Sequence, residues 1–314
     1  MKKQILLLGS ILALCGCSKS IEHHYFSYGY FDTYADIKLF EGEEQNLGDL
    51  SYILKKYSKI TDNYLETDLA NIYTINNSSE PVEVSEELYK VLEQTKDLEE
   101  DLSYFNMMIG SLSKKWKEAI AEKHVLSNEI ILSELEKINS SSLTLLDGNK
   151  VQKNGLAEID LGAIAKGFGL DAVKAELKNK NISKYIVDAG SSSILLGEKD
   201  TEDGLFTIRI KDLGNKYLKL KNCVISTSSI SEQSEVIDGK VYSHIINPET
   251  GDSTPINDAV IVITESGYAG DALSTTMMMA SIPEVQSFEN KYNAKAIVIR
   301  GGSVVYQNKG IEII

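Results

Sequence analysis

Apolar residues recur every three or four positions through much of the first half of the chain. This spacing predicts helices over residues 47–60 and 88–102, the second with Ser85 as its N-cap. Shorter stretches of the same spacing predict further helices over about 109–121 and around 132–138. The first half of the chain is therefore predicted to be mainly helical.

Strand patterns concentrate in the second half. Before them, an alternation predicts one early strand at 34–40, and a hairpin is predicted over 143–153. The later runs of strand length cover residues 185–187, 193–196, 205–211, 217–225, 241–245, 259–264, 296–300 and 304–307. Two late helices are predicted over 271–280 and after Pro283. Helices mostly in the first half and mixed strands in the second, without a fixed-period repeat, predict an α+β fold.

The N-terminus has the pattern of an export signal. Lys2 and Lys3 precede an apolar run over residues 5–14, which is shorter than a membrane span. The run ends in Leu-Cys-Gly-Cys-Ser, which resembles a bacterial lipobox with Cys17 as the lipidated residue. We therefore predict a lipoprotein signal peptide at residues 1–16 and an extracytoplasmic protein anchored to the bacterial cell membrane. An ordinary cleaved signal peptide is the alternative.

After the signal, residues 17–30 are predicted to form a tether and residues 31–314 one domain, because no Pro/Gly-rich linker interrupts them. The composition, 42% hydrophobic and 25% charged, is that of a folded protein. Cys223 is the only cysteine after residue 17, which excludes a disulfide framework within the domain and predicts a buried thiol.

The net charge of −14 argues against nucleic acid as the main partner, because a phosphate backbone requires a basic face. An anionic ligand would need positive charge supplied locally, by a metal ion or a few lysines. Asp271 and Thr275 are candidates for holding such an ion. They are four residues apart on a predicted helix, and carboxylate and hydroxyl oxygens suit Mg²⁺. The alternative is that Asp271 caps the helix and Thr275 bonds to its own backbone.

A second candidate site lies at Glu158–Gly169. Residues 158–161 are predicted to form a short strand that delivers Asp160 to a turn at Gly162. The following helix, predicted to end at 179–181, begins with small residues, so its N-terminus can face an anion. Lys166, predicted one turn into the helix, can direct its charge to a phosphate. The order of a Walker A loop is absent, and a plain strand-turn-helix with a surface lysine is the alternative.

Two further stretches carry polar groups. His244 is predicted on a strand that enters an Asn-Pro-Glu-Thr-Gly turn, where it can act as a base or as an ordinary hydrogen-bond partner. Residues 226–229, Ser-Thr-Ser-Ser, form a hydroxyl-rich strand end that can bind phosphate or ring edges, or can form a simple turn.

These four stretches, in this order, resemble the elements of the ApbE family of flavin transferases: an Asp-Leu-Gly-Gly-Ile-Ala-Lys-Gly-like turn, a Thr-Ser-Gly stretch, a His-Ile-Ile-Asp-Pro-x-Thr-Gly turn and an Ala-Asp-Ala-x-x-Thr helix. Earlier segments at Phe31, Tyr64 and 104–110 resemble the family as well. The match runs from about Phe31 to the end of the chain. Any one motif is common, whereas the ordered set is specific.

The resemblance implies a T-fold-like α+β architecture and an enzyme that transfers FMN from FAD to a threonine hydroxyl of an exported or membrane protein, releasing AMP. It implies Mg²⁺ held by Asp271, Thr275 and the backbone oxygen of Ala163. The FAD contacts that it implies are Phe31, Tyr64, Tyr104, Phe105, Asn106, Asp160, Lys166 and Ile246. His244 is our candidate for accepting the hydroxyl proton, with Lys166 neutralising charge on the leaving group.

The sequence also departs from the family pattern. Ser274 stands where some members have another metal-binding Asp, Asn106 replaces an Asp and Ser229 a Gly, and two extra residues follow Tyr64. The number of metal ions therefore stays open. A Mg²⁺-dependent FAD pyrophosphatase and a non-catalytic FAD-binding lipoprotein remain as alternative functions.

Overall fold

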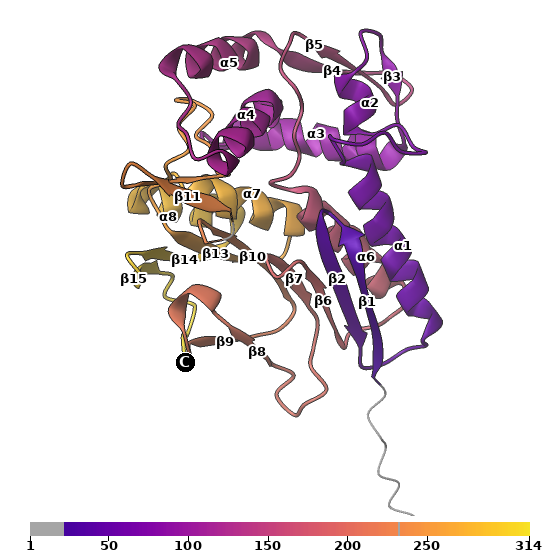
Figure 1. Cartoon of the computed structure of the whole chain (residues 1–314). Coiled ribbons are helices and arrows are strands. Elements are labelled where there is room, and N and C mark those ends of the chain that lie inside the picture. Colours follow the sequence, from indigo (N-terminus) through magenta and orange to yellow (C-terminus); the bar gives the residue numbers. More distant parts are fainter. Residues whose placement is uncertain (1–21, 232) are drawn as a thin grey trace, which may run out of the picture.

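The computed structural model describes residues 22–231 and 233–314, and its centre is an eight-stranded antiparallel sheet (Figure 1). The strand order is β1-β2-β6-β7-β10-β13-β14-β15. These strands are β1 (His23–Tyr30), β2 (Thr33–Leu39), β6 (Tyr185–Ala189), β7 (Ser193–Leu196), β10 (Cys223–Ser229), β13 (Ala259–Thr264), β14 (Lys295–Arg300) and β15 (Ser303–Gln307).

Two strand-strand-helix-helix-strand-strand units follow one another in this sheet. The first contains β1, β2, α1 (Gln45–Ile60), α6 (Ala165–Asn179), β6 and β7. The second contains β10, β13, α7 (Gly267–Met277), α8 (Ile282–Tyr292), β14 and β15. Within each unit the spatial order of the strands is their order in the chain. This architecture confirms the prediction of a T-fold-like α+β protein.

Helices α1, α6, α7 and α8 cover one face of the sheet (Figure 1). Leu50 and Leu54 of α1 and Val173 of α6 pack against the buried residues of β2 and β6, in keeping with the helical spacing of these apolar residues. The hairpin of β8 (Phe206–Arg209) and β9 (Tyr217–Leu220) packs on the other face of the sheet. The 3₁₀ turn η2 (Lys211–Leu213) lies between its two strands. All six residues of β13 are consequently buried.

A long insertion between α1 and α6 forms a further layer over the helices (Figure 1). It consists of α2 (Ile72–Asn76), β3 (Val82–Glu83), α3 (Glu86–Asp101), η1 (Met107–Ile109), α4 (Gly110–Ala121), α5 (Asn128–Ser140), β4 (Ser142–Leu146) and β5 (Lys150–Asn154). Ser85 caps α3 as predicted, by accepting from the amide of Leu88 at 3.2 Å. A second insertion, between β10 and β13, carries the hairpin of β11 (Ser234–Ile237) and β12 (Lys240–Ser243).

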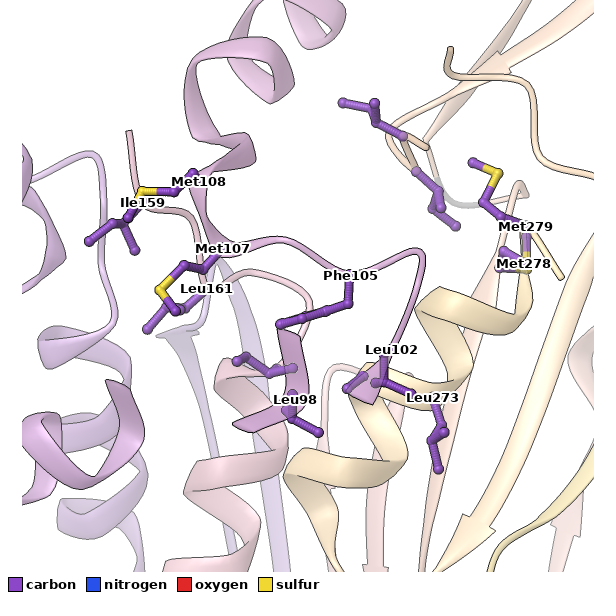
Figure 2. Close-up of a cluster of buried hydrophobic side chains, with 14 of the residues drawn as sticks. Leu98, Leu102, Phe105, Met107, Met108, Ile159, Leu161, Leu273, Met278 and Met279 are labelled. Carbon is purple, nitrogen blue, oxygen red and sulfur yellow. The ribbon is translucent and has the colours of Figure 1, made fainter. Parts of the chain in front are cut away.

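One buried cluster joins the insertion to the helical layer (Figure 2). Leu98 and Leu102, in and just after α3, pack in this cluster with Phe105 and Met107 of the next turn and with Leu273 of α7. Ile159 and Leu161 belong to the same cluster. The segments 104–109 and 158–164 are therefore held by apolar side chains, which leaves polar groups such as Asp160 at their surface.

Several predicted elements differ from the observed ones. Residues 158–161 form no strand, and at Ile159 the side chain of Asn76 takes the place of a neighbouring strand. Its amide nitrogen donates to the Ile159 carbonyl at 2.9 Å, and its oxygen accepts from the Ile159 amide at 2.8 Å. Residues 23–30, assigned to the tether, form β1, which pairs with β2 apart from a register shift between Tyr28 and Tyr30.

The predicted strand 217–225 is two strands, β9 and β10, because the backbone turns at Asn222 with φ 52°. The strand predicted at 241–245 ends at Ser243, so His244 follows β12 instead of lying on it. The helix predicted from Asp271 begins at Gly267, since Ser266 is its N-cap. Asp271 is therefore one turn inside α7 and does not cap it.

Two predictions concern residues at the N-terminus. The signal peptide at 1–16 and the lipidated Cys17 lie outside the described residues. Within residues 22–231 and 233–314, no helix has both the length and the apolar character that crossing a membrane requires.

Candidate active site at the crossing of α6 and α7

Helices α6 and α7 cross in contact at a pair of glycines. A Cβ on Gly167 would lie 2.3 Å from the carbonyl carbon and oxygen of Gly267, and a Cβ on Gly267 would lie 2.4 Å from the Gly167 oxygen. Next to the glycines, the rings of Phe168 and Tyr268 stack with centroids 4.6 Å apart. Only residues without a side chain allow this approach. The Gly-Phe-Gly sequence is thus needed for helix packing.

Each helix also supplies a carboxylate to the N-terminal turn of the other. Asp171 of α6 accepts hydrogen bonds from the amides of Gly267 and Tyr268 at 2.7 and 3.2 Å. Asp271 of α7 accepts one from the amide of Gly167 at 2.7 Å. First-turn amides have no partner within their own helix, so a carboxylate from the crossing helix satisfies them. This exchange brings the start of α6 against the middle of α7.

Asp271 is 5% exposed and accepts three hydrogen bonds. Its Oδ1 accepts from the hydroxyls of Ser193 and Ser226 at 2.8 and 2.6 Å, while its Oδ2 accepts from Gly167. Burial raises the pKa of the Asp271 carboxyl, although the positive charge of Lys166 and these hydrogen bonds oppose that rise. The side chain is therefore held in one orientation at a desolvated position.

The bond from Gly167 to Asp271 has a consequence for Ala163. In a regular helix the amide of Gly167 would donate to the carbonyl of Ala163, four residues earlier. That amide is directed to Asp271, and among the described residues the Ala163 carbonyl accepts no hydrogen bond. Ala163 lines a cavity with Asp271 and Thr275. The half-buried residue Ala163 thus has a backbone carbonyl without a hydrogen-bond partner among the described residues, in a cavity that a carboxylate and a hydroxyl also line.

A cavity of about 250 Å³ lies at this helix crossing and collects nearly every residue selected from the sequence. Its lining contains Tyr64, Tyr104, Phe105, Asn106, Asp160, Ala163, Lys166, His244, Ile246, Asp271 and Thr275. Phe31 is outside this lining. Its ring lies against α6, where a Cβ on Gly169 would be 2.9 Å from the ring tip. The positions 160–166 and 271–275, over a hundred residues apart in sequence, share one wall.

A family model described as the ApbE family matches residues 31–298 of the chain. The chain belongs to the ApbE family. Curated relatives include a FAD:protein FMN transferase from Vibrio cholerae serotype O1, 26% identical over 296 residues that cover 89% of this chain and 88% of the relative. Another, from Klebsiella pneumoniae, is 27% identical over 262 residues, or 77% of each chain.

Solved structures of the family have the same fold. The crystal structure of the ApbE protein from Thermotoga maritima has a TM-score of 0.78 at 24% identity, covering 92% of this chain and 97% of that chain. The flavin transferase ApbE from Vibrio cholerae has a TM-score of 0.72 at 21% identity, covering 93% and 98%. At these identities the likeness establishes the architecture.

In this ApbE-family chain, three oxygen donors could hold a hard cation: the carboxylate of Asp271, the hydroxyl of Thr275 and the open carbonyl of Ala163. They are of the type that Mg²⁺ prefers, and they leave further positions for water or phosphate oxygens. The part of the chain that the structure describes contains no cluster of three or more His, Cys, Asp or Glu that could hold a metal alone. The donor set therefore fits a cation shared with a ligand.

Ser274 and Ser228 extend the hydroxyl-lined wall. Ser274 donates to the carbonyl of Asp271 at 3.0 Å, and its hydroxyl lies 2.9 Å from that of Ser228. The Ser228 hydroxyl is also 3.3 Å from that of Thr275. The hydroxyl-rich end predicted at 226–229 thus lies on β10 and faces α7. Ser274 adds a neutral oxygen to this wall and no charge.

Lys166 is the second residue of α6 and lies in its first turn. The prediction placed it one turn further into the helix. It lines the cavity and, in the described part of the chain, forms no salt bridge. Asp160, on the same wall, accepts from the amide of Gly162 at 2.7 Å. Desolvation raises the pKa of the Asp160 carboxyl. The start of α6 therefore lines the cavity with the lysine that the sequence singled out, and its role toward an anion stays a prediction.

The cavity lining also has an aromatic and basic part. Tyr64 is 42% exposed, and the ammonium groups of Lys114 and Lys117 lie 5.2 and 5.0 Å from its ring centroid. Lys114 pairs with Glu158, whereas Lys117 lines the cavity without a carboxylate partner among the described residues. Sequence reasoning missed Lys117. Its spacing of four from cavity-lining Ser113 on α4 was the available signal, but an exposed helix face has the same pattern.

His244 is exposed at the cavity edge, just after β12. Its backbone amide donates to the Gln233 carbonyl at 3.1 Å, and its Nδ1 lies 3.3 Å from the same oxygen. Because a carbonyl only accepts, this contact favours the tautomer with the proton on Nδ1.

Cys223 is buried at the start of β10 and is a free cysteine. Burial raises the pKa of its thiol to about 11. The thiolate fraction at neutral pH is therefore very small, which supports the buried, unreactive role predicted for it over a reactive one.

Proposed function

We propose that this protein transfers FMN from FAD to a threonine hydroxyl of an acceptor protein and releases AMP, in a Mg²⁺-dependent reaction. The curated relatives carry the name FAD:protein FMN transferase, which supports the reaction class. One observation supports the metal and the diphosphate: the open Ala163 carbonyl, Thr275 and Asp271 share a cavity wall with Lys166. Mg²⁺ held there would offset the negative charge of the diphosphate.

The side chains suggest how the protein acts on the bound dinucleotide. Lys166, at the N-terminus of α6, would bind a diphosphate oxygen, and its charge would stabilise the AMP leaving group. The threonine oxygen would attack the FMN-side phosphorus, and the bond from that phosphorus to the AMP oxygen would break. His244 would accept the hydroxyl proton. Tyr64 and Phe105 offer aromatic surfaces for rings of the ligand.

Flavin transfer is tested by incubating the purified protein with FAD, Mg²⁺ and a panel of threonine-containing acceptor proteins. We expect a mass increase equal to FMN less water on a threonine, with one AMP released per label. Free FMN and AMP without labelling of any acceptor would instead identify a FAD pyrophosphatase. FAD that stays bound and intact in the presence of Mg²⁺ would identify a flavin-binding protein without transferase activity.

Lys117 provides a test of the dinucleotide site. Replacing it with Gln removes a cation that forms no salt bridge within the described residues, so we expect FAD to bind about 10- to 150-fold more weakly, a loss of about 1.5–3 kcal/mol, the range of a hydrogen bond to a charged group. Lys123→Gln is the matched control, because Lys123 pairs with Glu235 and is outside the cavity lining. Equal FAD affinity of Lys117→Gln and the wild type, measured by flavin fluorescence anisotropy, would remove Lys117 from the site.

We also propose that the protein acts outside the cytoplasm, anchored to the membrane by a lipid on Cys17. The support is the signal pattern of residues 1–17, and two or more acyl chains on one residue give stable anchoring. Membrane fractionation of the wild type and Cys17→Ser tests this proposal. Release of the variant into the soluble extracytoplasmic fraction is the expected result, and retention on the membrane would contradict it.

A further inference from the structure

The cavity wall carries little net charge for a site that would hold a divalent cation. Its acidic residues are Asp160 and Asp271, and its lysines are Lys117 and Lys166. The four formal charges cancel. Lys166 lines the same cavity as Asp271 and forms no salt bridge within the described residues. Without a ligand, the cavity therefore offers oxygen atoms to an incoming cation, but the formal charges of its lining give almost no net electrostatic attraction for that cation.

The hydrogen bonds of Asp271 also limit how many of its carboxylate lone pairs can bind a metal. A carboxylate oxygen has two lone-pair directions, and Oδ1 uses both of its own on the hydroxyls of Ser193 and Ser226. The amide of Gly167 uses one direction on Oδ2. One direction, on Oδ2, is left for a metal. The protein can therefore offer a monodentate carboxylate and neutral oxygens, and the remaining ligands must come from elsewhere.

We propose that this protein binds its divalent cation tightly only together with the dinucleotide, whose diphosphate supplies the missing negative charge and ligand oxygens. The inference rests on the proposed function, because it takes FAD as the ligand of this cavity. Lys166 has opposite effects on the binding of the cation and on the binding of the diphosphate. It repels the cation in the free protein and attracts the diphosphate, so it enforces joint binding.

Thermodynamic linkage allows the proposal to be tested either by metal affinity or by FAD affinity. If FAD strengthens metal binding by some factor, the metal strengthens FAD binding by the same factor. We expect this factor to be at least about tenfold, within the usual 5- to 150-fold range of coupling between ligands. Mn²⁺ serves as the paramagnetic probe of the cation, and its free concentration is read by electron paramagnetic resonance.

The experiment titrates the full protein with Mn²⁺ alone, and then titrates FAD by flavin fluorescence anisotropy with and without saturating Mn²⁺, in the absence of any acceptor. Lys166→Gln is the decisive variant. We expect it to bind Mn²⁺ alone several-fold more tightly than the wild type and to bind FAD more weakly. A loss of affinity for both ligands would overturn the role assigned to Lys166 in separating the two.

A second variant adds charge to the same wall. Ser274→Asp places a carboxylate beside Asp271 and Thr275 on α7, so we expect at least about tenfold tighter Mn²⁺ binding without FAD and a smaller coupling factor. Circular dichroism and cooperative unfolding establish whether each variant is folded. If Ser274→Asp does not fold, the result for Lys166→Gln alone tests the proposal.

The outcomes separate this inference from the proposed function. Weak Mn²⁺ binding alone with a coupling factor of ten or more supports the proposal. Equally tight Mn²⁺ binding with and without FAD would overturn it, while flavin transfer would stand. Absence of FAD binding under all conditions would overturn the proposed function as well.

Discussion

Asp271→Asn is expected to abolish metal-dependent flavin transfer and to leave the protein folded, because it removes one negative charge from the cavity. Asp271 supplies the only carboxylate among the three proposed cation ligands. Losing even an outer-shell partner of a metal typically costs 10- to 100-fold, so we expect a direct ligand to cost at least about 100-fold in rate. The measurement is AMP release at several Mg²⁺ concentrations.

The fold should tolerate Asp271→Asn because an amide can satisfy the same partners. The Asn oxygen would accept from the amide of Gly167, and its nitrogen would donate to the hydroxyls of Ser193 and Ser226, which can turn to accept. Burial raises the pKa of the Asp271 carboxyl in the folded state. Its ionisation therefore costs stability, and that cost grows as the pH rises from the unfolded to the folded pKa. Above this window, the neutral Asn avoids the cost, and we expect a change within about 1 kcal/mol.

Asp171→Asn is the matched control, because Asp171 is the counterpart of Asp271 at the helix crossing. It accepts from the amides of Gly267 and Tyr268 and from the hydroxyl of Ser266, and it is outside the cavity lining. We expect a loss of about 1–3 kcal/mol in the free energy of unfolding, because an Asn oxygen replaces two carboxylate acceptors, with transfer retained by the folded protein. If both variants lost activity alike, Asp271 would act through packing and not as a ligand.

Gly167→Ala is expected to cause the largest loss of stability of any single methyl group added near the site. The new Cβ would lie 2.3 Å from the backbone of Gly267, and neither helix has a flexible side chain there that could move away. Overpacking typically costs about 1–3 kcal/mol, and a contact this short with backbone atoms places the variant at about the upper end of that range. Separation of the helices would also weaken the bond from the Gly167 amide to Asp271. Urea unfolding and Mn²⁺ binding in the presence of FAD measure the two effects.

Gly48→Ala is the control for Gly167→Ala. Gly48 is also within a helix, α1, but a Cβ there would meet nothing within 4 Å. Alanine is favoured over glycine in a helix by about 1 kcal/mol, so this variant should be slightly more stable than the wild type. A Gly167→Ala protein as stable as Gly48→Ala would show that the glycine contact between α6 and α7 is not required.

Local sequence patterns were sufficient for most elements of this fold. The helical spacing of α1, α3 and α4, the cap at Ser85 and the apolar runs of β7 and β13 depend on residues a few positions apart. The ordered motifs also indicated the family, and nearly all of the site residues selected from the sequence line the cavity. Prediction was wrong at residues 158–161, where the distant Asn76 side chain bonds to Ile159, and at the start of α7, where the local cap Ser266 was overlooked.

The sequence by itself therefore determined the elements, the family and the kinds of chemical group available for the site. Only the tertiary structure decided how these groups act together. The contact of Gly167 with Gly267 directs the Gly167 amide to Asp271, and this leaves the Ala163 carbonyl open. Positions a hundred residues apart have no periodicity that links them. Their relation arises from helix packing, because close contact and hydrogen-bond satisfaction are properties of the folded chain.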